Sequence, residues 1–565
     1  MRGRGMGICT VGDYLLRRLR EIGVRHVFGV PGDYQLEFLD QVEAMDGIEW
    51  VGNCNELNAA YAADGYGRLN GIAALVTTFG VGELSALNGI AGAYAESVPV
   101  VSIVGTPATF VVEGKQKVHH TAGDGDFTRA AKCAGEYTVA QAVLTRDNAA
   151  SEIDRVLRFC WLLKRPVYIM LPSDVAYETI EAPAEPLALL EPSSDPRKLE
   201  RFAGQARDVL RAARSVAVLV GPEADRYHLT GQLRELAERT GCPVACLSNA
   251  KGVFPEDHDQ FIGGYAGKLS DAYVRETIEN AECLLAVGTQ FTDSVTGGFS
   301  QNIDPSRVIA LHPTAAAIGD SQYAHVSMKD ALLALVSTGI HKPAAITPLF
   351  GRRAAGQERE PVRSARLVQE RFWAQLQAFL EPGDVVIADQ GTSYYGCAEL
   401  PLPHGCTFMG QPLWGSIGYT LPALLGTMLA APGRRHVLLI GDGSFQLTAQ
   451  ELSTVLRHGL HPVIFLINND GYTVERCILG ADAGYNNIAT WRYDRLVEAF
   501  DPQNLATTAK ADTEDTLAAA LETARGNRDR LVFIEAVMER LDAPEGLVKL
   551  GKAFAAADYH HAPVS

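Results

Sequence analysis

The amino-acid sequence predicts an α/β protein made of three doubly wound domains with parallel sheets. Apolar, β-branched runs recur along the chain, end in Gly, Asp or Asn, and alternate with segments of helical periodicity. Such strands are typical of parallel sheets that helices cover on both faces. Two proline-rich stretches, residues 181–198 and 341–364, divide the 565 residues into thirds. Proline fixes φ and removes a backbone donor, so both stretches are expected to be extended linkers.

The expected strands are distributed over all three parts of the chain. In doubly wound sheets, ligands bind at the carboxyl ends of the strands, so the residues that follow each strand are the first candidates for a site. The strands are expected at residues 74–80, 100–105 and 166–172 in the first third, 215–221 and 283–288 in the second, and 384–389, 436–443, 462–469 and 531–538 in the last.

Composition argues against several classes of protein. The formal net charge of −17 disfavours nucleic acid and anionic membranes as partners. No apolar run reaches the length of a membrane span, and the start MRGRGMGICT lacks the apolar core of a secretory signal. The ten cysteines are scattered without a CxxC pair, which favours reduced thiols in a cytoplasmic enzyme.

The run LLIGDGSFQLTAQEL, residues 438–452, places an acid between two glycines where an expected strand ends. A helical stretch and the strand PVIFLI follow, and the chain then reaches NNDG at residues 468–471. A strand–helix–strand crossover brings the ends of neighbouring parallel strands together. Asp442 and Asn469, both bearing oxygen, are therefore expected to converge on one spot.

This spot is predicted to bind a metal ion together with a diphosphate. Mg²⁺ prefers a few hard oxygen ligands and takes phosphate oxygens for the rest. Gly443 lets the backbone approach a phosphate, and a helix that starts near Ser444 offers amide donors. A second GDG tripeptide, residues 123–125, has no preceding strand and no Asn pair at this distance, so we interpret it as local loop geometry.

GDG followed some two dozen residues later by NN resembles the signature of thiamine diphosphate enzymes. The stretches 29–40, 54–68, 77–96, 119–127 and 414–423 resemble 2-oxo acid decarboxylases, most densely the indolepyruvate and phenylpyruvate enzymes. The resemblance implies non-oxidative decarboxylation through the ylid and enamine of thiamine diphosphate, with Mg²⁺ as its metal. It also implies a pyrimidine-binding domain at 1–182, a central Rossmann-like domain at 198–342, and a diphosphate-binding domain at 362–565 with a closing C-terminal helix.

The resemblance gives Glu56 and Ile417 the task of preparing the cofactor. Glu56 would contact the pyrimidine ring and drive the tautomer that ionises the thiazolium, whereas an exposed helical Glu is the structural alternative. Ile417 would bend the cofactor, and the main chain of Gly415 and Ile417 would hold the pyrimidine edge. Because the two domains that share one cofactor come from different subunits in this family, Glu56 implies a homodimer, and a homotetramer is the expected assembly.

Proton transfer is assigned, through the same resemblance, to Asp33, His119, His120 and Glu475. Histidine titrates near neutrality, which suits a proton shuttle. Taken alone, two adjacent histidines are commonly a surface or chance pair, and a metal site would need further ligands at suitable spacing, of which the sequence shows none. The resemblance places Glu475 beside the carboxylate that leaves.

The remaining cofactor and substrate contacts are assigned in the same way. Thr392 and Ser444 would donate to the diphosphate, although both residue types are also common helix caps. The carbonyl of Gly471 would complete the metal shell of Asp442 and Asn469. The expected substrate pocket contains Gln390, Tyr394, Val474, Leu550 and Phe554, of which Val474 also contacts the cofactor.

The expected substrate depends on small differences between the pocket side chains of this chain and those of related enzymes. Gln390 resembles the enzymes for larger substrates, and Val474 is smaller than the isoleucine common in pyruvate enzymes, which would widen the pocket. The segment 545–556 resembles a closing helix that brings Leu550 and Phe554 to the cavity mouth, although a helix packed on the core explains the same apolar positions. We favour aromatic or branched-chain 2-oxo acids over pyruvate.

Three other interpretations stay open. The chain could be a pyruvate decarboxylase, or a carboligase like acetohydroxyacid synthase, which shares the cofactor signature but generally lacks the His pair, Asp33 and Glu475. A protein that uses the fold as a scaffold would be expected to lose Glu56 or the metal ligands. We expect no nucleotide in the central domain, because GPEADR at 221–226 is no convincing dinucleotide loop. The sequence leaves the pathway and substrate activation undecided.

Overall fold

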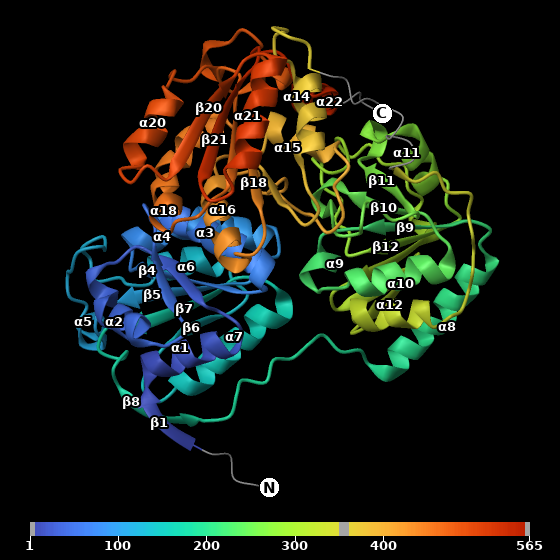
Figure 1. Cartoon of the computed structure of the whole chain (residues 1–565). Helices are drawn as coiled ribbons and strands as arrows, with labels where there is room; N and C mark the ends of the chain where they lie inside the picture. The colour runs from blue at the N-terminus through green and yellow to red at the C-terminus, as the bar shows by residue number, and fades with distance from the viewer. Residues whose placement is uncertain (1–5, 350–360, 560–565) are drawn as a thin grey trace. The chain divides into compact units, whose positions relative to one another are not determined.

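The computed structural model describes residues 6–349 and 361–559 (Figure 1). Part of the expected linker at 341–364 therefore lies outside the described residues. No helix in these two ranges is long and apolar enough to cross a membrane. The chain forms two compact units, the first from Met1–Glu191, Tyr419–Gly433 and Thr448–Leu460, and the second from Pro192–Gly418, Arg434–Leu447 and His461–Ser565.

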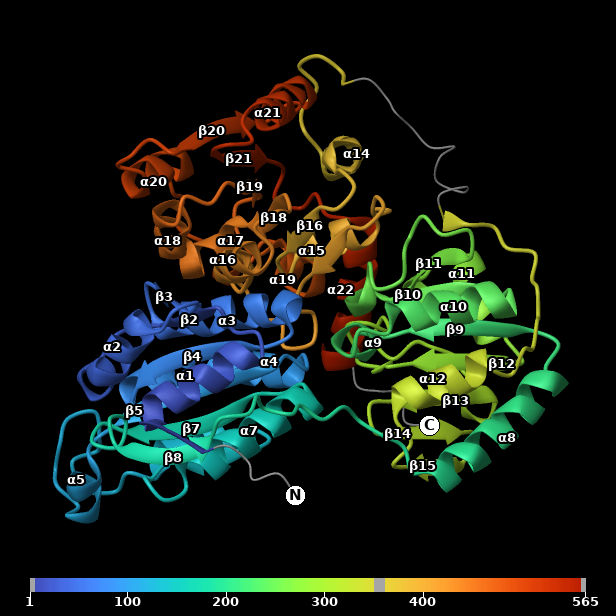
Figure 2. The same cartoon turned by 60° about the horizontal axis from the view of Figure 1, so that its bottom comes forward.

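The first unit is built on a six-stranded parallel sheet, visible in blue and cyan in Figure 2. Its order is β3 (Glu49–Gly52), β2 (His26–Gly29), β4 (Ala73–Thr78), β5 (Val100–Thr106), β7 (Val167–Pro172) and β6 (Gln141–Val143). β4 and β5 are buried along their whole length, which explains their unbroken apolar composition. One face shares a core with α1 (Val11–Glu21), α2 (Leu36–Ala44) and α7 (Ala149–Leu163).

The other face of this sheet carries α3 (Glu56–Asn70) and α4 (Val81–Ala95). From the last third of the chain, α16 (Thr420–Ala430) and α18 (Leu452–Arg457) also belong to this unit. α16 packs directly on α3, where a Cβ on Gly426 would lie 1.9 Å from the carbonyl oxygen of Ala62. Beside this contact the Tyr419 hydroxyl donates to the buried carboxylate of Asp64, which also pairs with Arg68. Small residues and a buried polar network therefore fix α3, the helix that begins at Glu56.

The second unit contains two sheets. The sheet of the middle third has the order β11 (Phe261–Tyr265), β10 (Val244–Leu247), β9 (Val216–Val220), β12 (Cys283–Val287), β13 (Val308–His312), β14 (Ala315–Ile318) and β15 (Ser321–Ala324). The last third forms a parallel sheet with the order β17 (Thr407–Met409), β16 (Val385–Ala388), β18 (His436–Gly441), β19 (Val463–Asn468), β21 (Leu531–Val537) and β20 (Ala506–Ala511). Its core includes side chains of α14 (Gln369–Phe379), α15 (Thr392–Ala398) and α21 (Glu514–Gly526).

The predicted α/β class is confirmed, and all nine expected strands are present, but three features differ from expectation. The middle sheet ends in the antiparallel strands β14 and β15, which are too short to give a clear pattern. A further antiparallel pair joins β1 (Met6–Thr10) to β8 (Thr179–Pro183). The helix expected from Ser444 to Leu460 begins earlier, as α17 (Asp442–Thr448), and is interrupted by a 3₁₀ turn at Ala449–Glu451 before α18.

Candidate active site

Asp442 directly follows β18 and is the first residue of α17. Its carboxylate is 1% exposed and accepts hydrogen bonds from the main-chain N–H groups of Gly443, at 2.8 Å, and Gly471, at 3.0 Å. Burial raises the pKa of Asp442 to about 6, although these main-chain donors oppose the shift. Among the described residues no cationic side chain pairs with this carboxylate. A buried charge in this position fits a cation supplied from outside the chain.

Asn469 leaves the same edge of the sheet as Asp442. β18 and β19 are parallel neighbours, with Gly441 opposite Ile467, so the residues after both strands lie together. Asn469 is buried, whereas the side chain of Asn468 donates to Oε1 of Glu535 at 2.7 Å. Asn468 is thus engaged within the sheet, and Asn469 is the amide that accompanies Asp442.

Gly471 closes this turn in a conformation that requires glycine. Its φ is 118°, and a Cβ would lie 2.3 Å from the carbonyl oxygen of Asn486. The buried Arg476 donates to the carbonyl groups of Asn469, at 3.3 Å, and Asp470, at 2.6 Å. Sequence reasoning missed Arg476, because one arginine in a helical stretch gives no signal. A carboxylate, an amide and main-chain carbonyls form a set of hard oxygen donors that fits Mg²⁺.

The residues expected to donate hydrogen bonds to a diphosphate follow two neighbouring strands. Thr392 begins α15 after β16, and Ser444 lies in the first turn of α17 after β18; both side chains are buried. The Oγ of Ser393 is buried without a hydrogen-bond partner among the described residues. Gln390 donates to the Tyr395 hydroxyl at 3.1 Å. Buried hydroxyl groups at the ends of parallel strands, of which that of Ser393 has no partner among the described residues, fit a group rich in phosphate oxygens.

The loop at 415–418 is shaped by its glycines. Gly415 has a φ of 68°, and no atom lies within 4 Å of the position that its Cβ would take. The N–H of Gly418 donates to Oδ1 of Asp389 at 3.3 Å, which ties the loop to the end of β16. Ile417, between them, is half-buried. The loop therefore presents open main chain and one bulky apolar side chain.

In the first unit, Glu56 is the first residue of α3, and the Asn55 side chain caps this helix by accepting from the N–H of Asn58 at 2.8 Å. A Cβ on Gly82 would lie 3.3 Å from Oε1 of Glu56, so the carboxylate lies against the start of α4. Thr78, at the end of β4, contacts Gly82 in the same way. Glu56 is thus held in a narrow space at the carboxyl end of a central strand.

Glu451 supports the segment that precedes Glu56, and sequence reasoning missed it. The carboxylate is fully buried and accepts from Nδ2 of Asn53 at 2.8 Å, from the N–H of Cys54 at 3.2 Å, and from Nδ2 of Asn58 at 2.9 Å. Nearly four hundred residues separate it from these partners in the sequence. Only the packing of the 448–460 segment within the first unit reveals the contact.

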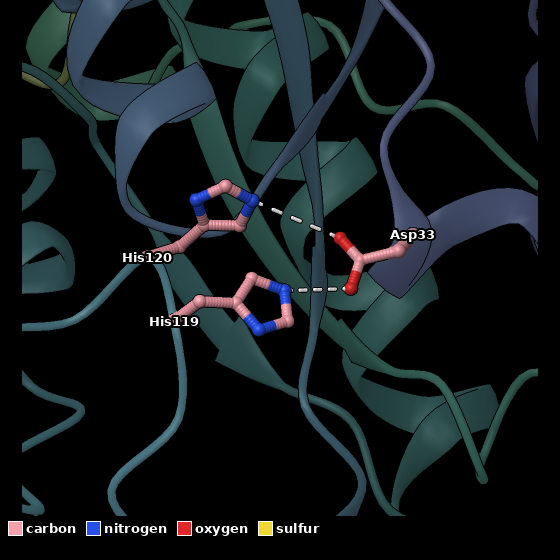
Figure 3. A group of neighbouring side chains, drawn as sticks. All are labelled: Asp33, His119 and His120. Atoms are coloured by element: carbon pink, nitrogen blue, oxygen red, sulfur yellow. Dashed lines mark hydrogen bonds and ion pairs between the residues drawn. The ribbon is translucent and has the colours of Figure 1, made fainter.

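Asp33, His119 and His120 meet in the first unit (Figure 3). Nε2 of His119 lies 2.7 Å from Oδ2 of Asp33, and Nε2 of His120 lies 3.8 Å from Oδ1. Asp33 follows β2 in a 3₁₀ turn at Asp33–Gln35, and the next residue, Tyr34, stacks on His119 with ring centroids 4.9 Å apart. The structure thus brings Asp33 to the adjacent pair His119 and His120, although Asp33 and His119 are 86 positions apart in the sequence.

The expected pocket residues lie in different surroundings. Leu550, in α22 (Glu545–Tyr559), lines a cavity of about 440 Å³ together with Tyr395 and residues of β11. Tyr394 packs in the core against Phe408, with ring centroids 5.5 Å apart. Val474 and Phe554 are half-buried, and Glu475 is exposed in α19 (Thr473–Ile478). Because Glu475 and Asp33 belong to different units, their joint role stays a prediction.

The second GDG tripeptide lies in an exposed loop. Arg129 donates to both carboxylate oxygens of Asp124, at 2.9 and 2.6 Å, and lowers the pKa of Asp124. This aspartate already has a cationic partner, which is the first residue of the helix α6 (Arg129–Gly135). Its surroundings differ from those of Asp442 in burial and in charge.

Comparison with known proteins identifies the class of protein that this fold and site define. Residues 9–125, 203–336 and 391–536 match the N-terminal TPP binding domain, the central domain and the C-terminal TPP binding domain of thiamine pyrophosphate enzymes. The chain is therefore a thiamine pyrophosphate enzyme, with thiamine diphosphate as its cofactor.

Curated relatives narrow this class. The chain is 47% identical over 543 residues to an alpha-keto-acid decarboxylase of Mycobacterium leprae, an alignment that covers 96% of this chain and 95% of the relative. It is 48% identical over 550 residues to the protein of the same name from Mycobacterium ulcerans, covering 96% of each chain. The protein belongs to the family of thiamine diphosphate-dependent 2-oxo acid decarboxylases.

Proposed function

We propose that this enzyme converts aromatic or branched-chain 2-oxo acids to an aldehyde and CO₂. The observation that carries decarboxylation is the contact of Asp33 with both His119 and His120, at 2.7 and 3.8 Å, whereas the preference for larger acids rests on Gln390 and Val474. Decarboxylation without a second substrate needs a proton donor for the carbon that loses CO₂, and paired imidazoles beside a carboxylate suit that task. A carboligase needs no such donor at this step.

Glu56 and the His pair are proposed to divide the proton transfers between them. Bound thiamine diphosphate supplies an electron sink for the bond that breaks. Glu56 is proposed to exchange a proton with the pyrimidine ring, because α3 and Gly82 hold its carboxylate in a narrow space. His119 and His120, oriented by Asp33, would deliver and withdraw protons at the product carbon and oxygen. Glu475 is proposed to face the carboxylate that leaves.

The second unit is proposed to hold the cofactor. Mg²⁺ would be bound by the side chains of Asp442 and Asn469 and by the carbonyl of Gly471, whose oxygens suit this ion. The open main chain at Gly415 and the buried hydroxyl groups support the other contacts. The proposed cofactor contacts are Thr392, Gly415, Ile417, Gly443, Ser444 and Val474, and the proposed substrate contacts are Gln390, Tyr394, Val474, Leu550 and Phe554.

The proposal also covers the domain bounds, the assembly and the cellular compartment. We propose domains at 1–182, 198–342 and 362–565, and active sites that join Glu56 of one subunit to the cofactor of another, in a dimer or tetramer. All ten cysteines are free, which supports a reducing compartment such as the cytoplasm.

Release of CO₂ from four acids tests this function. With thiamine diphosphate and Mg²⁺, we expect turnover of indolepyruvate, phenylpyruvate and 2-oxoisovalerate with a higher kcat/KM than pyruvate, by about 10-fold or more. Omission of the cofactor or of Mg²⁺ should abolish it. A preference for pyruvate would favour a pyruvate decarboxylase, and a requirement for a second oxo acid would favour a carboligase.

Gly80→Ala tests the support of the His pair. Gly80 has a φ of 68°, and a Cβ would lie 2.0 Å from the carbonyl oxygen of His120, so alanine must displace that backbone. We expect the variant to lose about 3 kcal/mol of unfolding free energy and most of its CO₂ release. Urea unfolding and the CO₂ assay measure the two effects.

Gly123→Ala is the matched control. Gly123 has a φ of 73°, but no atom lies within 4 Å of its would-be Cβ, so this change adds left-handed strain without a clash. We expect a loss of about 1 kcal/mol and nearly unchanged activity. Equal effects of the two substitutions would contradict the role of the His120 contact.

A further inference from the structure

We propose that Asp33, His119 and His120 form a second metal site, which takes a divalent transition-metal ion such as Zn²⁺ and thereby inhibits the enzyme. The inhibition rests on the proposed role of the His pair in proton transfer. The binding itself rests only on the geometry of the three side chains.

The three ligand atoms face one another. One nitrogen of each imidazole and a carboxylate oxygen of Asp33 all lie within 4.8 Å of one another, and Figure 3 shows both rings directed at the carboxylate. Zinc binds imidazole nitrogen and carboxylate oxygen at roughly 2.0–2.2 Å, so the side chains must rotate to admit the ion between them. The side chains are between 30% and 59% exposed, which leaves room for that rotation and for water ligands. Asp33 supplies the third ligand, which residue spacing alone did not reveal.

The backbone directs the adjacent side chains of His119 and His120 to the same carboxylate. In extended chain, consecutive side chains point to opposite sides. His120 has a φ of 61°, and this left-handed turn lets its imidazole reach the same carboxylate as that of His119. The absence of a Cβ on Gly80 leaves space for the His120 carbonyl. The backbone around Gly80 therefore places both imidazoles near Asp33.

Tyr34 orients the first of the two imidazoles. Its ring stacks on His119 at an angle of 11°, and its hydroxyl lies 3.4 Å from Nδ1 of His119. Metal-binding histidines usually engage their second ring nitrogen in this way, which leaves the other nitrogen for the metal. Here Nδ1 faces Tyr34 and Nε2 faces Asp33.

The donor atoms distinguish this site from the one at Asp442. Two imidazole nitrogens and one carboxylate oxygen favour Zn²⁺, Co²⁺ or Ni²⁺, whereas the oxygen donors of Asp442, Asn469 and Gly471 favour Mg²⁺. A metal ion and a proton compete for the same imidazole lone pair. A bound ion would therefore remove the proton donor that the proposed reaction needs.

Titration with Co²⁺ tests the proposal. It uses the holoenzyme, saturated with thiamine diphosphate and Mg²⁺, and no substrate. We expect about one equivalent of Co²⁺ to bind, seen by calorimetry and by its visible absorption. His119→Gln and His120→Gln should each weaken this binding by at least about 10-fold. His404→Gln is the control, because His404 is exposed and its Nδ1 lies 2.8 Å from Asp257 without a second imidazole in the pair.

Zn²⁺ added to the CO₂ assay tests the inhibition. We expect activity to fall by at least about 10-fold in the wild type and in His404→Gln, and to return when a chelator removes Zn²⁺ while Mg²⁺ is kept in excess. Co²⁺ binding that is unchanged in His119→Gln and His120→Gln would overturn the site, and Zn²⁺ bound there without inhibition would overturn its effect. A protein that binds Co²⁺ as expected but decarboxylates no acid would refute the proposed function and leave the metal site standing.

Discussion

Glu56→Gln is expected to lower CO₂ release by about 10²- to 10⁴-fold, because glutamine keeps the shape of the side chain but cannot exchange a proton. The surroundings should tolerate the change. Asn55 caps α3 independently of the Glu56 side chain, and the carboxylate lies against Gly82 without an ion pair among the described residues. Initial rates with phenylpyruvate measure the loss, and thermal unfolding with and without thiamine diphosphate shows whether the cofactor still binds.

Glu37→Gln is the matched control for this experiment. Glu37 lies in the first turn of α2, as Glu56 lies in the first turn of α3, but Glu37 is exposed. We expect its replacement to leave CO₂ release nearly unchanged. Activity of Glu56→Gln close to that of the wild type would exclude Glu56 from ionisation of the cofactor.

Strand ends were predictable from the sequence, because buried parallel strands carry a strong local signal. The nine expected strands include β18 and β19, and their parallel pairing follows from the helix between them. The placement of Asp442 and Asn469 at one edge of the sheet therefore follows from the order of residues along the chain. Short strands such as β3, whose residues Glu49–Gly52 mix charged and apolar types, gave no such signal.

Contacts between distant segments were not predictable. Glu451 accepts from Asn53, Cys54 and Asn58 only because the segment 448–460 packs in the first unit. The break in the expected helix at Ala449–Glu451 falls in the same segment. The roles of the individual site residues stay predictions, because they depend on the cofactor and on a second subunit.

Asp442→Asn is expected to abolish CO₂ release and the stabilisation that Mg²⁺ and thiamine diphosphate give to the wild type. Asparagine keeps one oxygen but removes the charge that attracts the metal ion, and only one of the N–H groups of Gly443 and Gly471 would retain its acceptor. A ligand at 100 times its Kd stabilises a protein by about 2.7 kcal/mol, so a large shift in Tm should disappear. Thermal unfolding with and without both ligands measures it.

Asp124→Asn is the control, because Asp124 is the acid of the other GDG tripeptide. It lies in an exposed loop and is held by Arg129, so its replacement should leave both activity and the ligand-dependent shift in Tm unchanged. Asp442→Asn that still shows the full shift would remove Asp442 from the metal site.

Without metal, the difference in Tm between the wild type and Asp442→Asn should change with pH. The pKa of Asp442 sets the direction of this change. Burial raises this pKa from 3.8 to about 6, so the folded state holds the proton more tightly than the unfolded chain. The resulting stability is fully present below about pH 4 and is lost as the pH rises through about 6, at most about 3 kcal/mol in all. Asp442→Asn lacks this titration, so its Tm relative to the wild type should rise between pH 4 and 7. The unpaired N–H group lowers the Tm of this variant by an amount that does not change with pH.

Mg²⁺ binding by the wild type should weaken as the pH falls through 6, because protons then compete for the same oxygens. A Tm difference that stays constant over this range would mean that the carboxylate of Asp442 is not strained by burial, and the case for a cation at this edge of the sheet would lose its electrostatic basis.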